Sequence, residues 1–287
     1  MTLTKIHTYL GLSLLVGGLL FTPACGDDAE DADTSTDSGD GDGDGDGDGD
    51  GDGDGDGDGD GDGDGDGDGD GEGDAQIRVM HLGVNVPGVD VHVNGGADPA
   101  FADINFREST VYAALPADDY VFNIAIAGTG VDASVLDVGP LGLAADTDYT
   151  AVAVGNLNDG LETIDVLALV DDKAGIGDAI RVQVVHAASS VGQVDIWNVT
   201  DPNAPALLLE DVDFKSAGTL DLPVADYAIG IDVDNDMVPD LIYGAPLATL
   251  QLTAGAFLNV YASDDMNGEV ALVAQLEDGT AIPIAAN

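Results

Sequence analysis

The chain has few basic residues and only one cysteine, and these shortages exclude some interactions and one kind of covalent link. Six Lys and Arg residues stand against 56 Asp and Glu residues, which gives a formal net charge of -50. So large an excess of negative charge excludes electrostatic attraction to nucleic acid or to anionic lipid head groups. The single cysteine, Cys25, excludes an intrachain disulfide. There is also no zinc-ligand spacing, no phosphate-binding loop, and no basic or aromatic stripe for nucleic acid.

The N-terminus has the organisation of an export signal. A short segment with one Lys precedes an apolar run over residues 10–21, which is too short to span a membrane comfortably. Small residues and then Cys25 follow, so the segment resembles a bacterial lipobox, with Thr22 where Leu is usual. We expect residues 1–24 to be a lipoprotein signal peptide and Cys25 to be the acylated N-terminus of the mature chain. The alternative is an ordinary secreted protein that is cleaved nearby.

Residues 25–75 contain almost no material for a hydrophobic core. Residues 39–70 repeat Gly-Asp without interruption. Glycine has the largest backbone entropy to lose, and neighbouring aspartates repel one another, so we expect a disordered and expanded tether. A weak calcium sponge is the other interpretation, but isolated aspartates on a disordered chain do not preorganise a site.

The remainder of the chain is a tandem repeat. Matching segments occur in the same order in both halves: "VMH" (79–81) with "VVH" (184–186), "VDVHV" (89–93) with "VDIWN" (194–198), "INFRES" (104–109) with "VDFKSA" (212–217), and "LPADDY" (115–120) with "LPVADY" (222–227). The unit of roughly 100 residues is a common domain size. We predict one domain over residues 76–174 and a second over residues 179–287.

Each repeat has the pattern of a β domain. Apolar or alternating β-branched runs, such as residues 89–93, 120–128, 149–155 and 164–170, are separated by Gly, Pro, Asn and Asp clusters. We therefore predict an all-β chain with two tandem antiparallel β-sandwich domains, Ig-like or transthyretin-like, and no amphipathic helix. The segment "APALLLEDV" (204–212) supports at most a short turn. Tyr120 and Tyr227 follow Pro-led turns, and we expect each to anchor its turn to the core.

A histidine and an aspartate recur at the same spacing in both repeats. His81 precedes Asp90 by nine residues, as His186 precedes Asp195. By strand parity each His lies at the end of an apolar stripe that faces the core, where a neutral imidazole can hydrogen bond across a loop. No nucleophile or third ligand recurs at a matching position. We therefore favour a structural signature over a metal or catalytic couple.

The same residues carry a resemblance to a known family. The "RVxHxxxxxxxVDVxV" stretch, the later "LPxxxY" and the "LxLxAxxxYT" strand resemble the bacterial domain-of-unknown-function family 4397. In the first repeat the motif residues are Arg78, Val79, His81, Val89, Asp90, Val91, Leu115, Pro116, Tyr120, Tyr149 and Thr150; in the second they are His186, Val194, Asp195, Leu222, Pro223 and Tyr227. The second repeat departs at Phe257, near the position of the family's Tyr. The resemblance implies an exported β domain, commonly paired, with no established activity and no catalytic residues to carry over.

One acidic loop has the spacing of a calcium site. In "DVDNDMVPD" the residues Asp232, Asp234, Asp236 and Asp240 occupy loop positions 1, 3, 5 and 9, and the Val238 carbonyl occupies position 7. Met237 stands where such loops have Gly, and Tyr243 stands where an EF-hand has Glu. Calcium is the one cofactor that the sequence suggests; the alternative is a solvated acidic hairpin.

These features predict a lipid-anchored protein of the bacterial cell envelope, at the outer membrane or cell surface, whose two domains bind a partner or serve a structural role. We expect no enzymatic activity. The predicted partners are the membrane, through Cys25, and an unidentified surface or extracellular ligand, at loops near residues 156–160 and 232–240. One alternative is a secreted hydrolase, which would need a cleft with titratable groups from both domains. The other is a purely structural envelope spacer.

Overall fold

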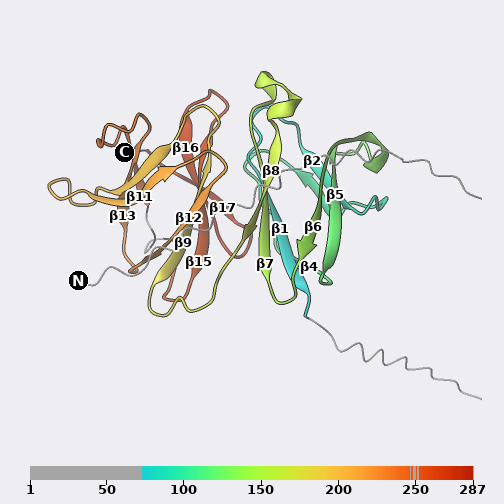
Figure 1. Ribbon diagram of the computed structural model, residues 1–287, viewed down its shortest axis with the longest axis horizontal. Helices are drawn as coiled ribbons and strands as arrows, with labels where there is room; N and C mark the ends of the chain where they lie inside the picture. Colours follow the sequence, from blue (N-terminus) through green and yellow to red (C-terminus); the bar gives the residue numbers. More distant parts are fainter. Residues whose placement is uncertain (1–72, 246, 248–249, 251, 287) are drawn as a thin grey trace, which may run out of the picture. The chain divides into compact units, whose positions relative to one another are not determined.

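Two β-sandwiches follow one another in the computed structural model, which describes residues 73–245, 247, 250 and 252–286 (Figure 1). The expected signal peptide, Cys25 and the Gly-Asp repeat lie outside the described residues. In the part of the chain that is described, no helix is long and apolar enough to cross a membrane. The prediction of an all-β chain with two tandem sandwiches is confirmed.

The first sandwich consists of two four-stranded sheets. One sheet contains, in spatial order, β4 (Ala113–Leu115), β1 (Ala75–His81), β7 (Asp148–Val154) and β8 (Asp165–Val170). The other contains β3 (Phe101–Ile104), β2 (Val89–Val93), β5 (Asp118–Ile126) and β6 (Ser134–Leu143). Alternate side chains of β1 and β2 point between the sheets, so Ile77, Val79, Val89 and Val91 pack in one core.

The second sandwich repeats this arrangement with one added strand. Its first sheet contains β12 (Ala217–Leu222), β9 (Ile180–Ala187), β15 (Phe257–Asp264), β16 (Val270–Gln275) and β17 (Ala281–Ile284). Its second sheet contains β11 (Ala206–Val212), β10 (Val194–Asn198), β13 (Tyr227–Asp232) and β14 (Leu241–Ala245). The prediction of at most a short turn over residues 204–212 is wrong, because most of this segment pairs with β10 and forms β11.

One strand pair in each sandwich is parallel. β1 pairs with β7, and β9 pairs with β15, while the other pairs of named strands are antiparallel. The two registers correspond, since His81 pairs with Ala153 and His186 pairs with Ala262. Alternation of apolar residues fixes which face of a strand is buried but not the direction of its neighbour, so this feature was not predictable from the pattern.

Short 3-10 turns and two tyrosine-anchored turns connect the strands. The 3-10 turns are η1 (Val131–Ala133), η2 (Leu157–Asp159) and η3 (Leu161–Thr163). The hydroxyl of Tyr120 donates to the carbonyl of Pro116, and that of Tyr227 donates to the carbonyl of Pro223, each over 2.9 Å. The predicted anchoring of both Pro-led turns by tyrosine is confirmed.

A third apolar cluster joins the two sandwiches. Met80, Leu82, Val152, Val154 and Leu169 of the first sandwich pack with Val185, Ala187, Tyr261 and Val273 of the second. These side chains lie on the outer faces of the sheets that contain β1 and β9. Both faces of β1 are consequently buried, one in the core of its own sandwich and one against the other sandwich.

Candidate functional site

A buried ion pair lies on the outer face of the first sandwich, beside the shared apolar cluster. The guanidinium of Arg78 on β1 contacts the carboxylate of Asp171 over 3.1 Å, and both side chains are fully buried. Arg78 also donates to the Thr150 hydroxyl over 2.9 Å, and that hydroxyl donates to Asp171 over 2.6 Å. The hydroxyl of Tyr112 donates to the same carboxylate. A buried charge is tolerated when it is paired and hydrogen bonded, and these contacts meet that condition.

The network crosses to the second sandwich. Arg78 donates to the carbonyl of Leu276 over 2.6 Å, and the amide of Asn259 on β15 donates to Asp171 over 3.2 Å. The Gln275 amide on β16 donates to the Ser109 hydroxyl over 2.5 Å. Burial and the nearby Asp171 raise the pKa of the Tyr112 hydroxyl, so it stays a donor at physiological pH. These bonds link the two sandwiches, and among the described residues the Asn259 side-chain oxygen is a buried atom of the network without a hydrogen-bond partner.

Sequence reasoning noted Arg78 only as a motif residue and missed Asp171. The available signal was a single charged residue in a largely apolar strand, since an Arg in such a position needs an acidic partner. The partner itself lies 93 positions away in sequence, and spacing does not identify it.

The two signature histidines have closely matching surroundings. His81 Nε2 lies 3.2 Å from the Pro87 carbonyl, and its Nδ1 accepts from the Gly83 amide over 3.2 Å. His186 Nε2 lies 2.6 Å from the Gly192 carbonyl, and its Nδ1 accepts from the Ala188 amide. Burial lowers the pKa of both imidazoles. Each ring therefore closes its loop as a neutral imidazole that donates from Nε2 and accepts at Nδ1.

The signature aspartates bond to other partners than the histidines. Asp90 accepts from the backbone amides of Asp103 and Gly128, each over 2.8 Å, and these bonds lower its pKa. Asp195 accepts from the amide of Asp211 over 2.7 Å. Each aspartate accepts a hydrogen bond from a backbone amide of the adjacent strand, which is β3 in the first sandwich and β11 in the second. This geometry favours a structural role over an acid-base couple.

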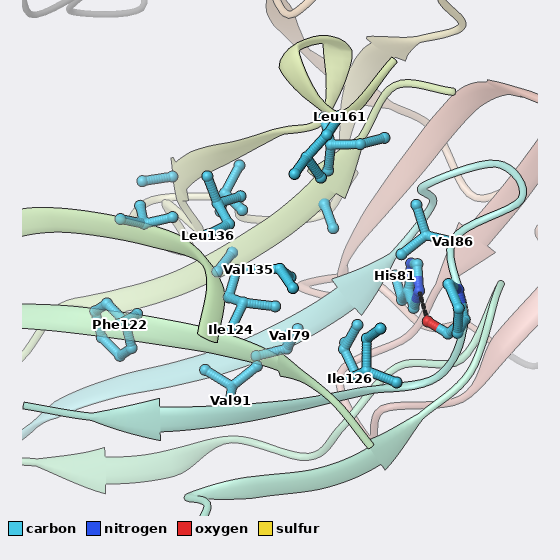
Figure 2. A pocket seen from close by; sticks show the side chains of 18 of the residues that line it. Val79, His81, Val86, Val91, Phe122, Ile124, Ile126, Val135, Leu136 and Leu161 are labelled. Carbon is cyan, nitrogen blue, oxygen red and sulfur yellow. Dashed lines mark hydrogen bonds between the residues drawn. The ribbon is translucent and has the colours of Figure 1, made fainter. Parts of the chain in front are cut away.

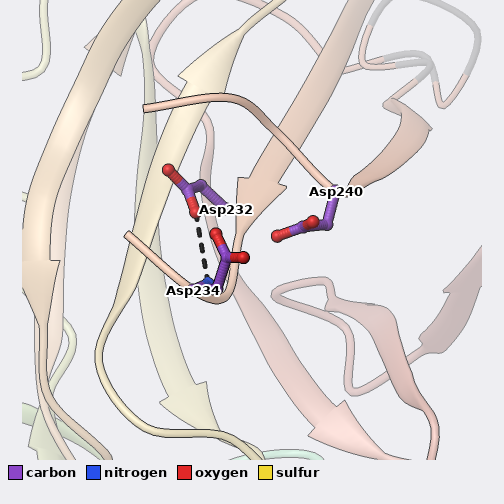
Figure 3. Close-up of side chains that lie close together, drawn as sticks. All are labelled: Asp232, Asp234 and Asp240. Carbon is purple, nitrogen blue, oxygen red and sulfur yellow. Dashed lines mark hydrogen bonds between the residues drawn. The ribbon is translucent and has the colours of Figure 1, made fainter. Parts of the chain in front are cut away.

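The acidic loop brings together three of its four predicted carboxylates. Oxygens of Asp232, Asp234 and Asp240 lie within 4.8 Å of one another (Figure 3). Asp236 is not in this group, although its charge is the main cause that raises the pKa of Asp234. Asp232 is fully buried and accepts from the amides of Asn235 and Met237, each over 2.8 Å. These backbone bonds to Asp232 fix the conformation of the loop. The three carboxylates offer one oxygen each to a cation that would bind between them.

The two residues that counted against a calcium loop behave differently from each other. Met237 adopts the left-handed conformation with φ 69°, so the sharp turn forms there without glycine. Tyr243 belongs to the core, and its hydroxyl donates to the Val270 carbonyl over 2.5 Å. The loop therefore has the expected turn but no ligand at position 12.

An apolar cavity of about 280 Å³ lies between the sheets of the first sandwich. Figure 2 shows Val79, Val91, Phe122 and Ile124 around this space, with Leu161 at its edge. Among the described residues, His81 is the only one with a polar side chain in the lining. The predicted binding loop at residues 156–160 contributes Leu157 to the lining, so this loop forms part of the cavity wall.

Comparisons with known proteins match the first sandwich to a family. The family model described as "Domain of unknown function (DUF4397)" matches residues 75–197, which include the first sandwich, β9 and all but the last residue of β10. No curated protein matches. Among solved structures, the Bacillus anthracis TIE protein aligns over 75% of this chain with 11% identity and a TM-score of 0.22, and the chain spans 45% of that structure. Residues 75–197 thus carry a domain similar to a family whose function is unknown.

Proposed function

We propose that the chain is a lipid-anchored protein of the bacterial cell envelope that presents two coupled β-sandwiches as one binding body. The observation that supports this proposal best is the buried contact between the sandwiches. A flexible pair of domains would leave Met80, Val152 and Tyr261 exposed, whereas here they pack together beside a buried polar network that links the two sandwiches. A body of this kind holds loops in fixed positions at the end of a tether.

A binding role agrees better with these side chains than a hydrolase does. The buried carboxylate between the sandwiches is engaged, because Asp171 accepts from Tyr112, Thr150 and Asn259. Both signature histidine rings are engaged with backbone groups. A hydrolytic site needs a nucleophile and a base that reach the substrate.

The second sandwich is proposed to be a second copy of the same family. Its strand order matches that of the first sandwich, and its His186 and Asp195 occupy positions equivalent to His81 and Asp90. Duplication of one domain explains both the repeated motifs and the repeated topology.

Calcium is proposed as a structural ligand of the second sandwich. Three mutually repelling carboxylates, Asp232, Asp234 and Asp240, converge in a turn of suitable spacing. A bound cation would remove that repulsion and fix the β13–β14 hairpin. Such a site would stabilise the loop and would not by itself supply catalysis.

The anchor is tested by expressing the chain and a Cys25→Ser variant in a bacterium with lipoprotein processing. We expect the wild-type protein to enter the detergent phase on phase separation and its N-terminal peptide to begin at an acylated Cys25. The variant should remain in the aqueous phase. A wild-type peptide that carries an unmodified Cys25 would overturn the anchor and favour a secreted protein.

A further inference from the structure

The cavity in the first sandwich has an opening that is itself apolar. Ile126, Val135 and Leu161 all line the cavity, and they are 40%, 41% and 51% exposed. They belong to β5, β6 and η3, so three separate elements contribute to the same apolar rim. Large aliphatic side chains that are exposed together around a hollow indicate a site for an apolar ligand.

The equivalent strand position of the second sandwich is more deeply buried. Ala153 and Ala262 are equivalent in register, because they pair with His81 and His186. Ala153 is half-buried and lines the cavity, whereas Ala262 is 1% exposed and belongs to a continuous core. Leu247 and Leu252, which follow β14, pack into that core. The described residues thus leave Ala153 half-buried in the first sandwich and bury its counterpart Ala262 in the second.

The residues after β7 account for part of the difference. In the first sandwich η2 and η3 separate β7 from β8, and Leu157, Leu161 and Ile164 from this segment reach the cavity. In the second sandwich the matching connection is a short acidic turn between Asp264 and Val270. The first sandwich thus has an added apolar segment at the place where its cavity opens.

The volume and the charge of the surroundings define the ligand. Apolar cavities of about 150 Å³ hold benzene, so a cavity of about 280 Å³ holds roughly ten to twelve carbon atoms. Glu162 directly follows Leu161 and Asp132 precedes Val135 by three residues, and no Lys or Arg of the described part of the chain lines the cavity. An anionic head group at the opening would meet negative charge and find no cationic partner in that lining.

We propose that the first sandwich binds a single aliphatic chain of about ten carbons whose head group carries no negative charge. The chain occupies the space between the two sheets, and the head group lies at the opening formed by Ile126, Val135 and Leu161. This site rests on the proposed role of the protein in binding, and it names the chemistry of the ligand.

The test uses 1-decanol as the probe and the chain from residue 25 onward with Cys25→Ser, because a detergent-solubilised anchor would bring a competing amphiphile. Methyl NMR of 13C-labelled alanine follows Ala151 and Ala153 in the cavity and Ala262 in the second sandwich. We expect saturable shifts of the first two methyls and none at Ala262. Decanoate at about pH 8, above the pKa of its carboxyl group, should bind at least about tenfold more weakly than 1-decanol.

Two variants test whether the ligand binds in the cavity. Ala151→Leu fills the space and should weaken 1-decanol binding at least about tenfold with no loss of melting temperature. Leu161→Ser at the rim should weaken it several-fold, while the control Met266→Ser, at an apolar side chain of similar exposure (56% against 51%), should not. Unshifted cavity methyls, equal shifts at Ala262, or equal binding of decanoate would overturn the proposal. Any of these results would leave acylation and the coupling of the sandwiches unaffected.

Discussion

Replacement of Arg78 by methionine should destabilise the protein more than loss of any exposed ion pair. Methionine fills similar apolar space but removes the donors to Thr150, Leu276 and Asp171. Asp171 then keeps its hydroxyl and amide donors but has lost its cation while it remains buried. Removing one partner of a buried pair leaves an uncompensated charge, which costs about 3–5 kcal/mol of unfolding free energy.

The measurement is urea unfolding of the Cys25→Ser chain, with Lys215→Met as a matched control. Lys215 and Asp165 also link the two sandwiches, over 2.7 Å, but their side chains are 34% and 55% exposed. An exposed pair contributes about 0–1 kcal/mol, so the control should lose no more than that.

A double variant separates the charge from the packing. Arg78→Met combined with Asp171→Leu removes both charges, so it should be more stable than Arg78→Met alone. If Arg78→Met costs no more than Lys215→Met, or if the double variant recovers nothing, the buried pair does not have the role described above.

Three further predictions concern the loops and turns. Millimolar calcium should raise the melting temperature, and at a concentration of 100 times Kd the added stability is about 2.7 kcal/mol. The double variant Asp234→Ala, Asp236→Ala should abolish this rise. An equal rise in the variant would contradict a calcium site in the loop. Tyr120→Phe and Tyr227→Phe should each cost about 1 kcal/mol in urea unfolding, because each removes one hydroxyl bond to a proline carbonyl. The pKa of His81 is lowered by burial, so its contribution to stability is complete above about pH 6.5 and falls as the pH drops towards the folded-state pKa, by up to about 1.4 kcal/mol per pH unit. His81→Gln should flatten the loss measured between about pH 7.5 and 5.5, and an unchanged slope would count against a buried neutral imidazole.

The strands and the core faces were predictable because the side-chain period of a strand is two. That period places Ile77 and Val79 on one face of β1, where they do form a core. The other face of the same strand carries Arg78 and Met80, and its burial depends on a sheet about a hundred residues away in the chain. Nothing local to β1 specifies that partner.

The candidate sites were predictable to a smaller extent. Spacing identified the acidic loop, because calcium loops alternate carboxylates, but it included Asp236, which lies outside the observed cluster. The cavity had no sequence signal. Ala153 and Ala262 are the same residue type at equivalent positions, and only the segments packed over them decide that Ala153 lines the cavity while Ala262 is 1% exposed in the core.

The coupling of the two sandwiches is tested most directly with two probes in one urea titration. Trp197 on β10 is the only tryptophan, so its fluorescence reports the second sandwich, while hydrogen exchange of β2 and β5 amides reports the first. If the buried interface makes the sandwiches one cooperative unit, both probes should give the same midpoint, and Arg78→Met should separate them. Two distinct midpoints in the wild-type chain would contradict the account and describe two independent domains on a tether.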